Sequence, residues 1–257
     1  MLKSFDKNVI GLIPAAGLAK RLSPIPCSKE IFPVGFDQNN QPKTAIQYLL
    51  DRFAFSGIKD IHIVLRNGKW DIPRYLGDGS EHMVNISYLI MKHPFGVPFT
   101  LDQAYPFIKN KIVAFGLPDI ILQPVSVFND LLSQLIKSNS DVVLGIYKAS
   151  NPQKMDLVEF DSNNRVREIY IKPRQSRLQH SWMTAVWTPR FTDFLHKTVA
   201  AKLEYFSDNF KTELNLGEVF NLALSNNIAI DHILFENYFY RDIGSPEDLI
   251  EVIKMNL

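Results

Sequence analysis

The sequence has few of the residues that would tie its fold to disulfides, structural zinc or a membrane. Its 257 residues include a single cysteine, Cys27, so an intramolecular disulfide is excluded, and no cysteine and histidine cluster has the spacing of a zinc site. No apolar run approaches the ~18 residues of a membrane-spanning helix. Residues 1–17 also lack the apolar core of a signal peptide. We therefore expect a cytoplasmic protein with no membrane partner.

A strong charge of one sign is also absent. Lys and Arg total 28 against 27 Asp and Glu, a formal charge of +1, so no overall field attracts nucleic acid and any anion-binding site must be local. With 46% hydrophobic residues the chain can bury a substantial core. No repeat or low-complexity segment divides it, so we expect a single domain over residues 1–257, with a first half at 1–150 and a second half at 151–257.

The first half alternates short apolar runs with amphipathic segments. Two segments, at 44–56 and 124–138, have apolar residues at helical spacing, and Gly57 is the expected stop of the first helix, because glycine commonly follows a helix. This alternation is typical of a layered α/β fold with a largely parallel sheet. The runs that indicate buried strands are residues 9–14, 61–65, 86–90, 112–117 and 142–147.

The second half is richer in strand patterns. Residues 157–173 indicate two strands joined by a turn at 162–164, and a further strand includes Val186 and Trp187 before a helix that starts at Pro189. Further helices are expected at 212–226 and 245–256. Ser245 suits the N-cap of the last helix, because Pro246 and acidic residues follow it.

The segment LIPAAGLAKRLSPIPCSKEIFPVG, residues 12–35, follows the first predicted strand. In an open parallel sheet, ligands collect beyond the carboxyl ends of the strands. Small residues there allow a ligand to approach the backbone, and cations neutralise phosphate. The pattern alone fits an ordinary turn with solvated cations equally well, and it matches neither GxxxxGK[ST] nor GxGxxG. The residues concerned are Ala15, Ala16, Gly17, Ala19, Lys20, Arg21 and Lys29.

This segment resembles the signature of the sugar-phosphate nucleotidyltransferases, such as the glucose-1-phosphate thymidylyltransferases and uridylyltransferases: L-x-P-A-A-G-x-G-T-R-L-x-P, then a lysine and P-V, in register without a gap. YLGDGSEHMVNISYLI, VEFDSNNRVREIYIKP and YFYRDIGSPEDLIE resemble later family segments in the same order. The resemblance implies a three-layer, Rossmann-like α/β fold of the nucleotide-diphospho-sugar transferase type. Its sheet is mixed and mostly parallel, and the second half is β-rich and binds the sugar.

The resemblance also implies the reaction and the roles of individual residues. A nucleoside triphosphate, UTP or dTTP by preference, would react with a sugar-1-phosphate in the presence of Mg²⁺. Arg21 would hold the triphosphate and Lys29 would bridge the reacting phosphates as the catalytic pair, while Asp119 and Asp242 would hold the metal. Lys172 would bind the sugar phosphate. Further nucleotide contacts are assigned to Ala15, Ala16, Gly17, Leu18, Lys20, Gly96 and Asp119, and a sugar-side carboxylate to Glu213.

Departures from the family pattern cluster at the expected ligand contacts. The second glycine and the threonine of the signature are Ala19 and Lys20, and Ile171 replaces a glutamate that usually binds sugar hydroxyls. Two hypotheses therefore stay open: an enzyme with an unusual sugar phosphate, or a nucleotide-sensing or regulatory module on the same fold. A metal-dependent glycosyltransferase would carry a D-x-D motif, which is absent. Homo-oligomer formation is left open. Further replacements are Met91, Asp156 and Ala185.

Overall fold

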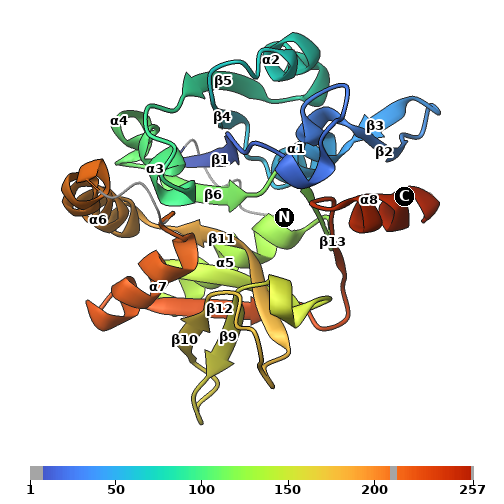
Figure 1. Cartoon of the computed structure of the whole chain (residues 1–257). Coiled ribbons are helices and arrows are strands. Elements are labelled where there is room, and N and C mark those ends of the chain that lie inside the picture. Colours follow the sequence, from blue (N-terminus) through green and yellow to red (C-terminus); the bar gives the residue numbers. More distant parts are fainter. Residues whose placement is uncertain (1–7, 209–212, 256–257) are drawn as a thin grey trace.

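A central sheet of nine strands organises the computed structural model, which describes residues 8–208 and 213–255. One row of seven strands forms most of the sheet (Figure 1). β11 is antiparallel to its neighbours β6 and β8, whereas β6, β1, β4 and β5 are parallel to one another. In order, the row is β12 (Ile230–Leu234), β8 (Val142–Lys148), β11 (His180–Trp187), β6 (Ile112–Gly116), β1 (Val9–Ala15), β4 (Asp60–Leu65) and β5 (Asn85–Ile90).

Helices cover both faces of this row and complete three layers. The side chains of β1 alternate, so that Leu12 packs into the core under α3, α4, α6 and α7, while Ile13 packs into the core under α1 and α5. This two-sided burial explains why the strands are continuous apolar runs. The helices are α1 (Ala45–Phe55), α3 (Val97–Asp102), α4 (Tyr105–Ile108), α5 (Val127–Ser138), α6 (Pro189–Asp208) and α7 (Leu216–Ser225).

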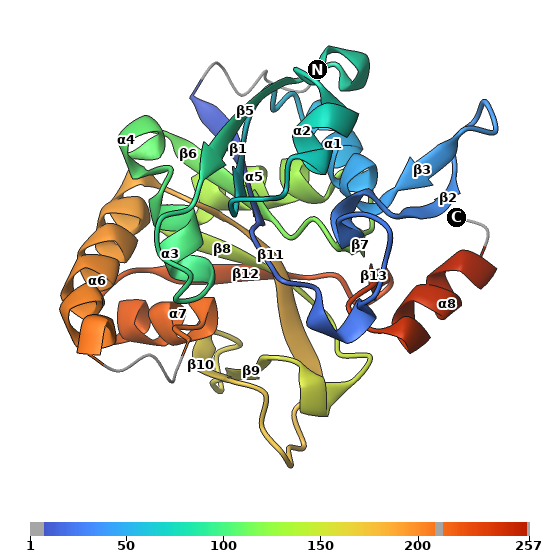
Figure 2. The same ribbon diagram turned by 45° about the horizontal axis from the view of Figure 1, so that its top comes forward.

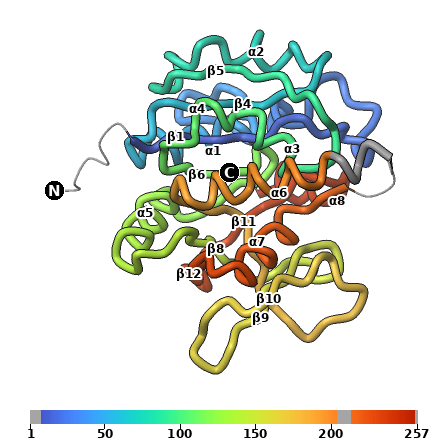
Figure 3. The backbone as a smooth tube through the Cα atoms, turned by 90° about the vertical axis from the view of Figure 1, so that its left-hand side faces the viewer, coloured from blue at the N-terminus to red at the C-terminus, as the bar shows by residue number. Residues whose placement is uncertain are grey.

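Smaller elements lie at the ends of the sheet. The hairpin of β9 (Leu157–Phe160) and β10 (Val166–Tyr170) joins β11 and extends from the lower end of the molecule (Figure 3). β7 (Ile120–Leu122) and β13 (Tyr240–Asp242) form a separate antiparallel pair. The remaining elements are β2 (Pro33–Phe36), β3 (Pro42–Thr44), α2 (Asp71–Leu76), α8 (Pro246–Lys254) and the short 3₁₀ turns Lys20–Leu22, Lys29–Ile31, Ser80–His82 and Pro152–Lys154.

The strands predicted from apolar runs are confirmed, as are the helix at 44–56 and the last helix, which the structure shows as Pro246–Lys254. Asn256, the predicted end of that helix, lies outside the described residues. Ser245 caps α8, and its hydroxyl oxygen accepts a hydrogen bond from the Asp248 amide at 3.3 Å. The predicted start of the helix at 124–138 is wrong, because residues 124–126 form a turn in which the Val127 amide donates to the Pro124 carbonyl at 3.2 Å, and α5 begins only at Val127.

The predicted helix at 212–226 begins later than expected, at Leu216. Asn215 and Glu218 form a reciprocal cap there, in which the Asn215 amide donates to the Glu218 carboxylate at 2.7 Å. Thr212, the predicted first residue, lies outside the described residues. Within the parts of the chain that the structure describes, none of the helices combines the length and apolarity needed to cross a membrane.

Candidate active site

The loop after β1 changes from buried to exposed within a few residues. Ala15 ends the strand with a fully buried side chain, so it can offer a ligand only its backbone, whereas Gly17 and Leu18 are exposed. Ala19 adopts a left-handed conformation with φ of 49° and starts the turn Lys20–Leu22. This turn presents the side chains of Lys20 and Arg21 at the protein surface.

Asp119 and Asp242 meet through the pairing of β7 with β13, although they are far apart in the sequence. Asp119 immediately precedes β7, and Asp242 lies opposite Ile120 at the end of β13. The Ile243 amide donates to the Asp119 carbonyl at 3.1 Å and extends this pairing. In Figure 2 the segment that follows β1 lies close to β13, so the signature loop and both aspartates share one region.

Lys29 and Arg21 complete this group from the signature loop. The Lys29 ammonium forms an ion pair with the Asp119 carboxylate, and both side chains are about 15% exposed. A methyl group added at Gly244 would lie 2.8 Å from Arg21 Nη2 and 2.8 Å from Asp242 Oδ1, so these two side chains lie close to each other beside Gly244. The structure therefore brings together four predicted residues: Arg21, Lys29, Asp119 and Asp242.

The electrostatics of the group reflect two carboxylates held near one lysine. Burial, and then the negative charge of Asp119, raise the pKa of Asp242 to about 6, although the Gly244 amide donates to its carboxylate at 2.6 Å. Burial disfavours the charged Lys29 ammonium, but its contact with Asp119 outweighs burial and keeps the pKa of Lys29 above its ordinary value. Excess negative charge at Asp242 favours binding of a cation.

The donor set of this group fits Mg²⁺. Across residues 8–208 and 213–255 there is no cluster of three or more His, Cys, Asp or Glu side chains that could hold a metal by itself. Mg²⁺ commonly takes one or two carboxylates and completes its shell with phosphate oxygens and water. Asp119 and Asp242 could supply such a pair of oxygen ligands.

The predicted sugar-phosphate residue Lys172 lies in a separate group in the second half. Burial raises the pKa of the Asp156 carboxyl above its ordinary value, and the charge and backbone N–H of Lys172 oppose this rise. Glu218 adds to that rise. A methyl group added at Gly217 would lie 2.6 Å from Ile171 Cδ1 and 3.1 Å from Asp156 Oδ2, so Ile171 and Asp156 lie together at the start of α7.

Gly96 and Glu213 are joined indirectly through Leu214. Gly96 has φ of +113°, and a methyl group there would lie 2.1 Å from the Leu214 carbonyl oxygen. The Leu214 amide also donates to the Phe95 carbonyl at 2.9 Å. Glu213 is exposed, and its assignment to the sugar side stays a prediction. In the described ranges, no hydrogen bond or ion pair links Lys172, Gly96 or Glu213 to Arg21 or Lys29.

Sequence reasoning missed the residues that support this site. Gly244 was passed over because a glycine after a strand is also typical of an ordinary turn. Asp71 and Lys69, which contact the neighbours of Lys29, resemble a helix-start acid and a surface lysine. Their loop follows β4, beside β1 in the sheet. Loops that follow neighbouring parallel strands meet at the same edge of a sheet, so the position of residues 69–71 after the strand beside β1 is the signal that could have identified them.

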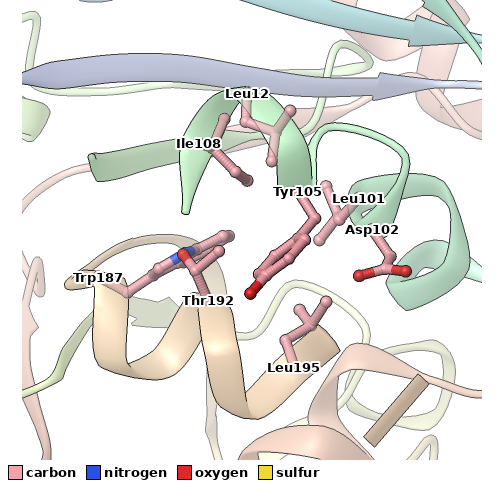
Figure 4. A pocket seen from close by; sticks show the side chains of 8 residues that line it. All are labelled: Leu12, Leu101, Asp102, Tyr105, Ile108, Trp187, Thr192 and Leu195. Carbon is pink, nitrogen blue, oxygen red and sulfur yellow. The ribbon is translucent and has the colours of Figure 1, made fainter. Parts of the chain in front are cut away.

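A small cavity lies elsewhere, between the sheet and α3, α4 and α6 (Figure 4). It holds about 10 Å³, roughly the space of one water molecule. Its polar groups are already engaged: the Tyr105 hydroxyl donates to Asp193 at 3.0 Å, and Asp102 is hydrogen bonded to His196 at 2.8 Å. This cavity is too small for a nucleotide or a sugar.

Comparison with known proteins finds relatives over nearly the whole chain. The model of the nucleotidyl transferase family matches residues 10–257. A low-salt glycan biosynthesis nucleotidyltransferase of Haloferax volcanii is 25% identical over 251 residues, which are 96% of this chain and 66% of that protein. A glucose-1-phosphate thymidylyltransferase of Neisseria gonorrhoeae is 29% identical over 94% of this chain and 80% of its own length.

The fold is likewise that of solved nucleotidyltransferases. The crystal structure of a UDP-glucose pyrophosphorylase complexed with UDP-glucose superposes with a TM-score of 0.78 at 18% identity, covering 96% of this chain and 98% of that one. The predicted Rossmann-like fold of the nucleotide-diphospho-sugar transferase type is thus confirmed. The chain spans about two thirds of the length of the Haloferax relative.

Proposed function

We propose that this chain, which belongs to the nucleotidyl transferase family, transfers a nucleotidyl group from UTP or dTTP to a sugar-1-phosphate and releases pyrophosphate. The observation that carries the proposal is the meeting of Arg21, Lys29, Asp119 and Asp242 at one place. Two cations can neutralise the triphosphate and two carboxylates can hold its metal ion, so the four side chains together fit a metal–triphosphate complex better than an ordinary solvated turn.

In the reaction, a phosphate oxygen of the sugar-1-phosphate forms a bond to the α-phosphorus of the triphosphate. The bond from that phosphorus to the bridging oxygen breaks, and pyrophosphate leaves with the electron pair. Such a transfer needs positioning and charge neutralisation more than covalent help. Arg21 holds the triphosphate, Lys29 contacts the oxygens whose charge grows in the transition state, and Lys172 binds the sugar phosphate.

Asp119 and Asp242 would hold Mg²⁺ in this site. When bound there, the ion would neutralise charge on the triphosphate oxygens. The Lys29 ammonium compensates the charge of the Asp119 carboxylate, whereas the pKa of Asp242 is raised by burial and by the charge of Asp119.

The proposal is tested by measuring pyrophosphate release for each common nucleoside triphosphate with a panel of sugar-1-phosphates in Mg²⁺. We expect turnover with at least one pair, UTP or dTTP being the preferred nucleotide. Asp119→Ala removes one metal ligand and the partner of Lys29, and should lower kcat by at least about a hundredfold. Turnover that is unchanged in Asp119→Ala would contradict the assignment.

A second function is favoured by the group around Asp156. Asp156 Oδ1 is buried and lacks a hydrogen-bond partner among the described residues, and it lies beside Ile171, where the family pattern has a sugar-binding glutamate. A site altered in this way suits a module that binds a nucleotide without transferring it. Nucleotide binding by calorimetry, together with no turnover for every pair in the panel, would support this second function.

A further inference from the structure

Asp71, the first residue of α2, holds the residue that precedes Lys29. The amide of Ser28 donates to Asp71 Oδ2 at 2.6 Å, and its hydroxyl donates to Asp71 Oδ1 at 2.8 Å. Burial opposes the charged form of Asp71, but these hydrogen bonds outweigh it and hold the pKa of Asp71 below its ordinary value. Both carboxylate oxygens thus accept hydrogen bonds from Ser28 of the signature loop, and Oδ1 also accepts one from the Ile72 amide at 3.1 Å.

Lys69, in the loop between β4 and α2, forms an ion pair with Glu30, the residue that follows Lys29. Lys69 Nζ lies 2.6 Å from Glu30 Oε1, and Glu30 and Lys69 are only 1% and 4% exposed. Burial lowers the pKa of Lys69, against the opposing charge of Glu30. A buried ion pair adds little net stability compared with apolar residues of similar volume. Its clearest effect here is to fix the backbone beside Lys29.

We propose that Asp71 and Lys69 are positioning residues that determine where the Lys29 ammonium meets Asp119 and the reacting phosphates. Lysine has four rotatable bonds, so a fixed backbone on both sides restricts the positions that its ammonium reaches. A displacement of about 1 Å at a reacting group can lower the rate by about a hundredfold. The kinetic part of the inference rests on the proposed nucleotidyl transfer.

The first experiment separates positioning from stability at the buried ion pair. Lys69→Met alone leaves Glu30 charged and unpaired, so this variant is expected to lose stability. The double variant Glu30→Leu with Lys69→Met removes both charges and should regain the wild-type Tm. Positioning predicts that kcat of the double variant stays about tenfold to a hundredfold low, with both KM values within about threefold of wild type. Recovery of kcat together with Tm would overturn the role of Lys69.

The second experiment tests the grip on Ser28. Asp71→Ala should lower kcat by about a hundredfold with little change in KM, and Asp71→Asn, which keeps one carbonyl acceptor, should lie between Asp71→Ala and wild type. Asp78→Ala is a matched control, because Asp78 also accepts from a serine amide, that of Ser80 at 3.0 Å. This control should keep wild-type kcat, and an equal loss in both alanine variants would overturn the assignment.

Amide hydrogen exchange gives a measurement that does not need turnover. Asp71→Ala should raise the exchange rates of residues 28–31 while leaving those of β1 unchanged, and Asp78→Ala should raise neither. If the wild-type chain turns over no substrate pair, the proposed function fails. The exchange rates still show whether Asp71 holds Ser28 and the residues around Lys29 in place. Exchange at residues 28–31 as slow in Asp71→Ala as in wild type would overturn it.

Discussion

Ala19 occupies a backbone conformation that favours glycine, in the middle of the loop that carries Arg21. Its φ of 49° places its Cβ against the following carbonyl, at a cost of about 1–2 kcal/mol. The family pattern has a glycine at this position. The methyl group therefore strains the loop locally, and the rest of the loop must hold this conformation in place.

Ala19→Gly should stabilise the protein slightly. The substitution removes backbone strain of about 1–2 kcal/mol. Glycine makes the unfolded chain more flexible, which costs about 0.5–1 kcal/mol, so the free energy of unfolding should rise by about 0.5 kcal/mol. Urea denaturation measures this change. Ala16→Gly is the control, because Ala16 is not in the left-handed region, and this variant should lose stability. A loss of stability in Ala19→Gly would contradict the strain.

Asp242 should make the effect of Mg²⁺ on stability depend on pH. Its pKa in the fold is about 6, above the ordinary 3.8, so the metal-free fold loses stability as the pH rises between these values and the carboxylate becomes charged. Mg²⁺ binds the deprotonated form. The rise in Tm produced by Mg²⁺ should therefore grow as the pH increases through about 6.

Thermal unfolding with and without Mg²⁺ at pH 5 and pH 7.5 measures this effect. Asp242→Asn should remove the Mg²⁺-dependent rise at both pH values, and it should raise the metal-free Tm at pH 7.5 relative to wild type. Asp60→Asn, at an exposed aspartate, should keep the wild-type response. An equal rise in Tm at both pH values would contradict the link to Asp242.

At the scale of elements, the start of α3 and the start of α7 are held together at Gly96. Gly96→Ala would place a methyl group 2.1 Å from a backbone oxygen that cannot move independently. We expect a loss of more than about 2 kcal/mol in the free energy of unfolding. Gly57→Ala is the control: its φ is +73°, but nothing lies within 4 Å of the added methyl, so it should lose only about 1–2 kcal/mol.

Urea denaturation of both variants measures this difference. Similar losses in the two variants would mean that the contact between Gly96 and Leu214 does not join α3 to α7. Hydrogen exchange at the start of α7 adds a local measurement, which should rise in Gly96→Ala and stay unchanged in Gly57→Ala.

The sequence predicted long elements well and short ones poorly. Strands buried on both faces, such as β1 and β8, appear as continuous apolar runs, and α1 has a clear helical period with a stop at Gly57. β7 and β13 have three residues each, too few for any period to show. Their pairing depends on contacts between distant parts of the chain.

At the scale of the whole molecule, the two halves of the sequence share one sheet. β11 from the second half lies between β6 and β8 from the first half, so neither half has a complete core alone. We therefore expect one cooperative unfolding transition. In a Trp70→Phe variant, the remaining tryptophans, Trp182 and Trp187, report on β11. Their fluorescence and the far-UV circular dichroism should change at the same urea concentration, and separate midpoints would contradict a single domain.

The site itself was only partly predictable from the sequence. The cationic turn with Arg21 is visible as a local pattern, but a pattern alone did not distinguish it from a solvated turn. Asp119 and Asp242 were paired through the family resemblance, since no local rule joins residues so far apart. Asp71 was missed, because its contact with Ser28 arises only when neighbouring strands bring two loops together.

In the proposed function, the cationic turn and the two distant aspartates bind one Mg²⁺–triphosphate complex. A crystal structure of the chain with Mg²⁺ and a non-hydrolysable UTP analogue tests it most directly. We predict one ion at about 2.0–2.1 Å from carboxylate oxygens of both Asp119 and Asp242, with the triphosphate in contact with Arg21 and Lys29. A triphosphate bound elsewhere on the protein, or an ion that contacts neither aspartate, would contradict the account.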